Sequence, residues 1–243
     1  MYSIFLKEIN HFFSSLIGYI SLGVYLIISG LFLWVFPDTN ILDYGFASLD
    51  TLFFMSPWFF MFLIPAITMR SFADEFKSGT IELLATKPLS DMQIILGKFF
   101  AAVVLVLFAL LPTLIYYYSI YQLGSTPGNI DTGATWGSYI GLLFLGASFV
   151  AIGIFASSLT DNQIVAFIIG VFLSFFCFLG FEYISSLPIF FGFVDNIVLS
   201  LGINAHYESI SRGVIDTRDI LYFISLIIVF LLLSKIVLAN RKW

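Results

Sequence analysis

The stretch FFAAVVLVLFALLPTLIYYYSIY, residues 99–121, decides the fold of this chain. It contains no Asp, Glu, Lys, Arg or His. At about 1.5 Å per residue, a helix of this length crosses a hydrocarbon layer of roughly 30 Å. Lipid offers the backbone no hydrogen-bonding partners, so a segment inside the membrane must satisfy its own N–H and C=O groups, as a helix does. The stretch therefore predicts a transmembrane helix.

Similar apolar runs fill most of the chain. Together they predict six transmembrane helices, at about 16–36, 52–69, 99–121, 138–158, 162–181 and 220–238. The first five contain no charged residue or histidine, and the sixth has only Lys235 near its end, where a long side chain can reach the interface. Of the 243 residues, 60% are apolar and 10% are charged, against roughly a quarter charged in soluble domains. We predict an all-α integral membrane protein with a single transmembrane domain over residues 1–243.

The distribution of basic residues predicts the orientation. With the N-terminus in the cytoplasm, eight of the ten Lys and Arg residues fall on the inside, and only Arg212 and Arg218 fall outside. This agrees with the positive-inside rule. The 37–51 connection has three Asp and no Lys or Arg, as an outer loop should. We therefore expect a multi-pass protein of the bacterial inner membrane with both termini in the cytoplasm.

Local patterns mark helix starts. Ser90 and Gln93 have the spacing of a capping box just before a span, and so do Thr160 and Gln163. Asp216 precedes the last span, where the helix dipole favours a negative charge. These patterns support the same six-span division of the chain.

Small residues recur along the predicted span at 138–158. Helix association in lipid depends on close backbone approach, which small side chains permit. The pattern favours a packed helix bundle, with close contacts along this span at Gly137, Gly141, Gly146, Ala147, Ala151, Gly153 and Ser157.

The most informative polar segment is RSFADEFKSGTIELLATKPLSD, residues 70–91. Its first half spaces Phe72 and Phe76 four residues apart, which predicts a short helix with an apolar stripe and a charged back. Ser78-Gly79-Thr80 should break this helix from a second one. The pattern alone allows two interpretations: an interfacial helix that joins two spans, or a docking surface for a cytoplasmic partner.

Residues 72–91 closely resemble the E-x-x-x-G-T-I-E-x-L-L-x-x-P-x-S stretch between the second and third spans of ABC-2 type transporter permeases. In that family this segment, here within 70–98, is a coupling helix that rests on a separate nucleotide-binding subunit. Ala85 stands where the family pattern has Leu. The resemblance implies ATPase-coupling roles for Glu75, Lys77, Ser78, Gly79, Thr80, Glu82 and Leu83, and the apolar stripe adds Phe72 and Phe76.

The resemblance extends over essentially the whole chain, and within the family it is strongest to the gliding-motility-associated permease of gliding bacteria. It implies an ABC-2 permease-like bundle with a cytoplasmic coupling helix and an outer re-entrant hairpin. The implied partners are a cytoplasmic ABC ATPase subunit, a second copy or a companion permease or auxiliary membrane protein, and the lipid bilayer, but no nucleic acid. ATP and Mg would be bound by the ATPase subunit, and this chain would bind no cofactor.

A second polar region, 182–219, separates the last two spans. Its apolar segment 187–193 is too short to span a membrane and should be interfacial or re-entrant. His206 and Glu208 could ligate a metal, but two ligands do not make a site. We instead expect a hydrogen-bonded or ion-paired loop folded onto the bundle. Its candidate structural or gating residues are His206, Glu208, Arg212 and Asp216.

Several functional classes are disfavoured because the residues that they need are absent from the sequence. There is no G-x-x-x-x-G-K-[ST] phosphate-binding loop and no G-x-S-x-G nucleophile elbow, so we expect no enzymatic activity in this chain. Ion-coupled carriers rely on charges inside their spans, which are lacking here. The sequence therefore favours a permease subunit of an ABC-2 exporter. The alternative is a non-transporting membrane scaffold that uses residues 70–91 to recruit a cytoplasmic partner.

Overall fold

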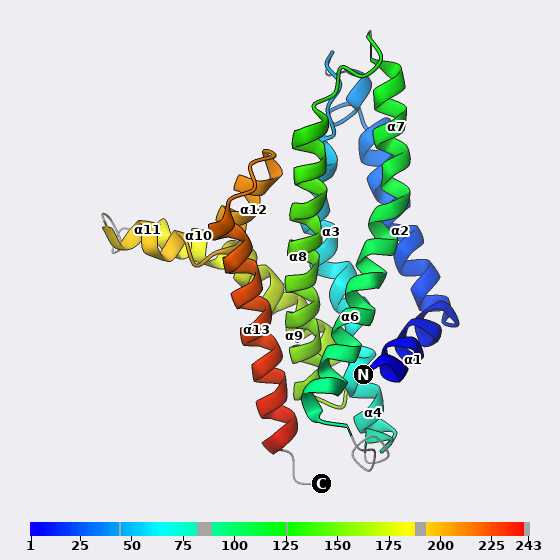
Figure 1. Ribbon diagram of the computed structural model, residues 1–243, viewed down its shortest axis with the longest axis vertical. Coiled ribbons are helices and arrows are strands. Elements are labelled where there is room, and N and C mark those ends of the chain that lie inside the picture. The colour runs from blue at the N-terminus through cyan, green and yellow to red at the C-terminus, as the bar shows by residue number, and fades with distance from the viewer. Residues whose placement is uncertain (44, 82–88, 125, 188–192, 241–243) are drawn as a thin grey trace.

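The computed structural model describes residues 1–43, 45–81, 89–124, 126–187 and 193–240. Within these ranges the chain is helical with turns and loops and contains no strand (Figure 1). The helices are α1 (Tyr2–Phe13), α2 (Leu16–Trp34), η1 (Ile41–Asp43), α3 (Asp50–Thr68), α4 (Arg70–Lys77), α6 (Asp91–Leu110), η2 (Leu111–Thr113), α7 (Leu114–Leu123), α8 (Thr132–Leu159), α9 (Gln163–Phe175), the π turn η3 (Phe176–Gly180), α10 (Phe181–Ser185), α11 (Phe193–Leu199), α12 (Ile203–Ser211) and α13 (Thr217–Asn240).

The predicted spans are present as long apolar helices. Five continuous stretches of the described residues are long and apolar enough to cross a membrane: Asp50–Lys77, Asp91–Leu123, Thr132–Leu159, Gln163–Ser185 and Thr217–Asn240. A sixth crossing is provided by α2 when it is taken together with α1, from which it is bent by 67°. The structure thus confirms an all-α bundle with five to six membrane-spanning helices.

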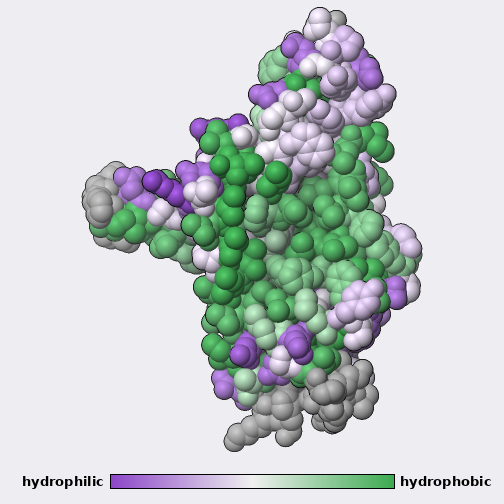
Figure 2. Space-filling model, in the orientation of Figure 1, coloured by the Kyte–Doolittle hydropathy of each residue, from purple (hydrophilic) through white to green (hydrophobic). Residues whose placement is uncertain are grey.

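The long helices run side by side, and their ends differ (Figure 1). One end, which we call the α4 end, carries α1, α4 and the last turn of α13. The connections between α2 and α3 and between α7 and α8 lie at the opposite end. Figure 2 shows an apolar band around the middle of this face, with polar residues toward both ends. This is the surface expected of a bundle surrounded by lipid.

Helix α8 is the central element and contacts α3, α4, α6, α9, α12 and α13. Its small residues lie where neighbours approach. A Cβ on Gly141, Gly146 or Gly153 would come within 3.0 Å of a side chain on another helix. The close packing predicted for this span is confirmed. It holds because glycine lets the partner side chains approach the α8 backbone.

Two of the three predicted helix starts are confirmed, and one is corrected. Ser90 and Gln93 form the capping box of α6, and Asp216 Oδ1 accepts a hydrogen bond from Arg218 N at 2.9 Å. The start of α9 is capped by Asn162, whose Oδ1 accepts from Ile164 N at 2.9 Å. Thr160 lies two residues too early to cap this helix, and its hydroxyl instead accepts from Asn162 N.

The predicted outer hairpin is present as two contacting short helices, α10 and α11, which project sideways from the bundle (Figure 1). Residues 188–192, which hold most of the apolar segment 187–193, lie outside the described residues. Helix α12 then packs on α8 and leads into α13. A re-entrant path of this hairpin through the membrane stays a prediction.

We predict that Gly153→Leu destabilises the bundle, because a Cβ at this position would lie 2.0 Å from Thr68 Oγ1. Thr68 is fully buried and its hydroxyl donates to Ile64 O, so it cannot move without losing that bond. The free energy of unfolding should fall by about 1–3 kcal/mol. Gly23→Leu is the matched control because nothing lies within 4 Å of a Cβ there. Thermal unfolding in detergent measures both variants, and equal melting temperatures would contradict the packing.

Candidate functional site

Helix α4, the first half of the predicted coupling segment, is fixed directly to the centre of the bundle. It follows α3 after Met69 and also packs on α8 and α9. The Ser157 hydroxyl of α8 accepts hydrogen bonds from Phe72 N at 3.0 Å and Ala73 N at 3.1 Å, and it donates to Met69 O at 2.9 Å. A side chain of the central helix therefore satisfies the backbone in the first turn of α4.

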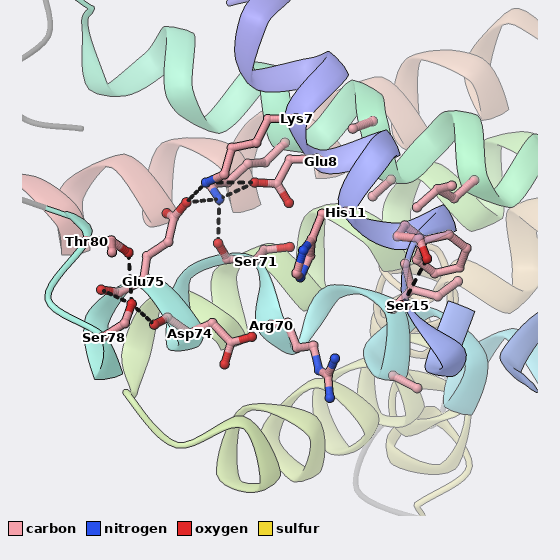
Figure 3. Close-up of a pocket in the computed structure, with 17 residues that line it drawn as sticks. Lys7, Glu8, His11, Ser15, Arg70, Ser71, Asp74, Glu75, Ser78 and Thr80 are labelled. Carbon is pink, nitrogen blue, oxygen red and sulfur yellow. Dashed lines mark hydrogen bonds and ion pairs between the residues drawn. The ribbon is translucent and has the colours of Figure 1, made fainter. Parts of the chain in front are cut away.

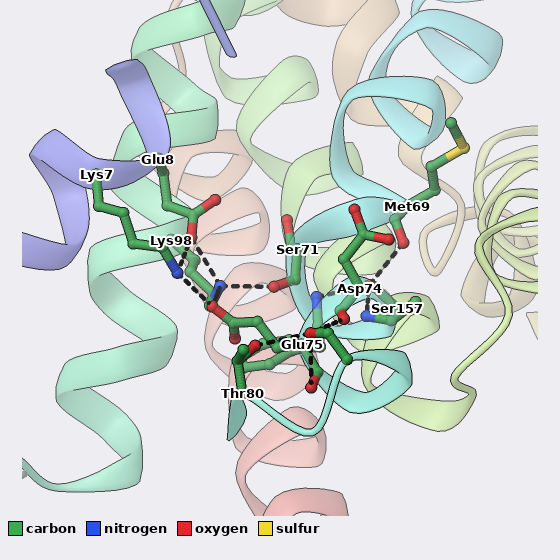
Figure 4. A network of polar contacts seen from close by, with 12 residues as sticks. Lys7, Glu8, Met69, Ser71, Asp74, Glu75, Thr80, Lys98 and Ser157 are labelled. Carbon is green, nitrogen blue, oxygen red and sulfur yellow. Dashed lines mark hydrogen bonds and ion pairs between the residues drawn. The ribbon is translucent and has the colours of Figure 1, made fainter. Parts of the chain in front are cut away.

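A buried charge cluster joins three helices at the α4 end (Figure 4). Lys98 of α6 is only 2% exposed, and its Nζ lies 2.8 Å from Glu8 Oε1 and 3.0 Å from Glu75 Oε1. The same ammonium donates to Ser71 O. Lys7 of α1 reaches Glu75 Oε1 at 2.7 Å. The ammonium groups of Lys7 and Lys98 are thus balanced by the carboxylates of Glu8 and Glu75. A buried charge requires such a partner of opposite sign.

The pKa of Lys7 is raised within this cluster. Its partial burial lowers the pKa, but the hydrogen bond to Glu75 and the negative charges of Glu75 and Glu8 outweigh that effect. A raised pKa stabilises the fold fully below the ordinary lysine value of 10.5, and this contribution is lost as the pH rises through the folded-state pKa. The Lys7 contact is therefore insensitive to pH near neutrality.

The structure separates the predicted coupling residues into two groups. Phe72 and Glu75 are buried, Phe76 is half-buried and stacks on Phe72, and the Lys98 ammonium lies 4.9 Å above the Phe72 ring. The second group is exposed and comprises Lys77, Ser78, Gly79 and Thr80. Glu82 and Leu83 lie outside the described residues. The inner group holds α4 in place, and the exposed group is available to a partner.

The predicted break after α4 is confirmed. Ser78 caps the end of the helix with its N–H bonded to Asp74 O, and Gly79 has φ +69°. This left-handed conformation favours glycine because a Cβ would be strained there. The Ser78 hydroxyl also lies 2.9 Å from the Thr80 hydroxyl. The chain therefore turns sharply at Ser78 and Gly79, directly after α4.

Sequence reasoning did not identify Glu8, Lys98 and Ser157 as site residues. Lys98 served only to orient the chain, and Ser157 only as a small residue in a span. The partners of Lys98 lie 23 to 90 residues away in the chain, and Met69, the acceptor of the Ser157 hydroxyl, lies 88 residues away. The one available signal was that Lys98 stands directly before an apolar run, where an ammonium needs a partner.

At the opposite side of the bundle, His206 joins α12 to α13. Its Nδ1 lies 2.7 Å from Asp219 Oδ1, its Nε2 lies 2.9 Å from Ser200 O, and its ring stacks on Tyr222. Ser200 O can only accept, so Nε2 carries the hydrogen. The expectation of a loop folded onto the bundle by polar contacts is confirmed.

The other candidate residues of the 182–219 region have separate contacts. Glu208 pairs with Arg212 on the exposed face of α12, and Asp216 caps α13. His206 and Glu208 therefore have different partners. Tyr207 anchors α12 to α3 by donating to Phe53 O at 2.7 Å, and burial raises the pKa of its hydroxyl well above the usual range.

The apolar spans define a multi-pass membrane protein. Its α4 end carries the buried charge cluster and the exposed residues Lys77 to Thr80. The family model of the ABC-2 family transporter protein matches residues 5–243. Because the match covers nearly the whole chain, this chain belongs to the ABC-2 transporter family. Comparison with curated proteins finds no match. Members of this family are membrane transport components that are typically not catalytic themselves.

We predict that Lys98→Met lowers the free energy of unfolding by about 3–5 kcal/mol, because it leaves buried carboxylate charge without its ammonium. Adding Glu75→Gln should recover part of the loss, since the double variant removes both charges of the 3.0 Å pair. Lys77→Met on the exposed end of α4 is the control and should have little effect. If the double variant is no more stable than Lys98→Met alone in chemical or thermal unfolding, the two groups are not coupled.

We predict that Ser157→Ala loosens α4, because the amides of Phe72 and Ala73 lose their acceptor. The expected cost is about 1–2 kcal/mol, seen as faster amide hydrogen exchange in α4. Ser174→Ala is the matched control, because Ser174 is equally buried but its hydroxyl has no hydrogen-bond partner among the described residues. Unchanged exchange in α4 for Ser157→Ala would refute the role of this hydroxyl.

Proposed function

We propose that this chain is the permease subunit of an ATP-driven ABC-2 exporter. A separate cytoplasmic ABC ATPase subunit would bind ATP and Mg and dock on the exposed end of α4. The observation that carries the proposal is that Lys77, Ser78, Gly79 and Thr80 are exposed at the end of α4, a helix joined to α1, α6 and α8. Membership of the ABC-2 family supports it, because such permeases normally work with a cytoplasmic ATPase subunit.

The orientation belongs to the same proposal. The α4 end would face the cytoplasm of a bacterial cell, with both termini on that side and the spans in the inner membrane. The excess of basic residues in the corresponding segments supports this assignment. It also puts the exposed tip of α4 in the compartment that contains ATP.

The contacts of α4 suggest how a push from the ATPase would spread. Movement of the tip would be carried to α8 through Ser157 and to α1 and α6 through the cluster around Lys98. Separating the buried charges would leave them unpaired, so α4 and its neighbours would move together. A motion that begins at one turn of chain would therefore tilt several spans.

A second copy or a companion permease would complete the transport path. A cavity of about 650 Å³ lies beside α3, η3 and α12, with Phe53, Trp58 and Phe178 among its lining residues and Glu182 and Arg212 also bordering it. A partner placed against this side would enclose an aromatic passage. Assignment to the gliding-motility transporters is part of the proposal and rests on the sequence resemblance to the gliding-motility-associated permease, which extends over essentially the whole chain.

We predict that Thr80→Arg prevents copurification with the ATPase subunit, because it places a long charged side chain at the exposed tip. Insertion into the membrane should be unchanged. Gln122→Arg is the control, because it adds the same side chain at an exposed position on α7, at the opposite end of the bundle. Copurification and nucleotide hydrolysis by the reconstituted complex measure the effect. An ATPase that still binds Thr80→Arg at wild-type level would contradict docking at this tip.

A further inference from the structure

A cavity lies beside the charge cluster, between α1, α3, α4 and α6, with a volume of about 210 Å³ (Figure 3). One part of its wall is apolar and includes Ala66 and Ile67 of α3 and Leu105 of α6. The other part is polar and includes His11 of α1 and Arg70 of α4. The lining of the cavity therefore matches an amphiphile, with apolar side chains on one part and polar side chains on the other.

Arg70 is the cation of this cavity that the charge cluster does not use. Its Nε is buried and has no hydrogen-bond partner, and within the described residues its guanidinium forms no ion pair. Lys7 and Lys98, in contrast, are both held by carboxylates. Asp74, one turn along α4 from Arg70, accepts from Gln163. Among the described residues no carboxylate lies within ion-pair distance of the Arg70 guanidinium, and an anion in the cavity would balance its charge.

His11 adds a second polar group on the same side. Figure 3 shows His11 and Arg70 away from the contacts that join Lys7, Glu8 and Glu75. The His11 side chain is exposed and forms no hydrogen bond within the part of the chain that the structure describes. Arginine and histidine together are suited to a phosphate group, which the guanidinium can bind through two parallel hydrogen bonds.

The depth of Arg70 in the bundle points to the source of that phosphate. Helices α3 and α4 form one continuous stretch from Asp50 to Lys77. At about 1.5 Å per residue, Arg70 lies roughly 30 Å from Asp50, which is the thickness of the hydrocarbon layer. Arg70 is therefore at the level of the lipid head groups, and Ala66 and Ile67 are one turn deeper, at the level of the acyl chains.

We propose that this cavity binds one membrane phospholipid, with its phosphate on Arg70 and His11 and the first part of an acyl chain along Ala66, Ile67 and Leu105. A free phosphate ion would share the polar contacts but would leave the apolar wall unused. The lipid fills the angle between α1 and the spans beside the cluster. It would brace α1 against the helix that carries the exposed tip.

Native mass spectrometry of the full chain, extracted from membranes that contain phosphatidylethanolamine and phosphatidylglycerol, tests the proposal. The wild type should retain one phospholipid, and Arg70→Gln should lower the retained fraction about tenfold, as expected for losing a charge-assisted contact. Arg70→Lys keeps the charge and should retain an intermediate fraction. Ala66→Leu, which fills the apolar wall, should also displace the lipid.

Lys235→Gln is the matched control, because Lys235 is an exposed cation near the α4 end of α13, outside the cavity. Its retained lipid should equal that of the wild type. The proposal is overturned if Arg70→Gln and Ala66→Leu retain lipid at wild-type level, or if Lys235→Gln loses as much as Arg70→Gln. It is also overturned if inorganic phosphate raises the melting temperature of the delipidated chain as much as phospholipid does.

This experiment distinguishes a loss of lipid binding from a failure to fold and from a loss of transport. Melting temperatures of the delipidated variants identify any variant that fails to fold, and in that case Arg70→Lys and Ala66→Leu decide the outcome. The measurement needs no ATPase subunit. A negative result would therefore leave the proposed transport function intact, and a failure of the ATPase to bind would leave the lipid site intact.

Discussion

The position of α4 depends on the pairing of a buried ammonium group. Lys98 is 2% exposed at the boundary of an apolar span, where an unpaired charge would cost several kcal/mol. Its pairing involves Glu8 from α1 and Glu75 from α4, so both helices must approach α6 at this point. Removing α4 or α6 would leave the remaining charges of the cluster unbalanced. The charge requirement therefore acts as a geometric restraint on α4.

The same requirement, applied to uncharged polar groups, arranges the rest of the bundle. Lipid cannot hydrogen-bond to a hydroxyl or a free backbone group, so each one needs a partner inside the protein. Ser157 meets the first turn of α4, Ser138 donates to Ser211 O at 2.8 Å, and the hydroxyls of Tyr25 and Ser56 lie 3.1 Å apart. Each contact joins different helices. Because the apolar side chains pack without direction, these few polar contacts specify which helices meet and at what depth.

The contrast between local apolar patterns and polar contacts between distant residues explains what could be predicted from the sequence. Hydropathy indicated the spans because length and apolar composition are local properties, and the capping box at Ser90 is local as well. The cap at Thr160 was misplaced because two polar residues compete within three positions and the structure selects Asn162. The cluster around Lys98 was not predicted, since its partners are 23 to 90 residues away and several acidic residues were available. The pattern of residues 70–91 indicated a working surface but not that Phe72 and Glu75 point inward.

The buried and exposed residues of α4 have complementary physical roles. A partner that bound only a loop without contacts to the bundle would move the loop but not the spans. Here the exposed residues, Lys77 to Thr80, directly follow a helix whose inner face is fixed by a serine of the central span and by paired charges. At the other side, His206 and Asp219 join α12 to the last span through the 2.7 Å contact between Nδ1 and Oδ1. A force applied at the α4 end would act on α1, α6 and α8 together, which is what the proposed coupling to a separate ATPase requires.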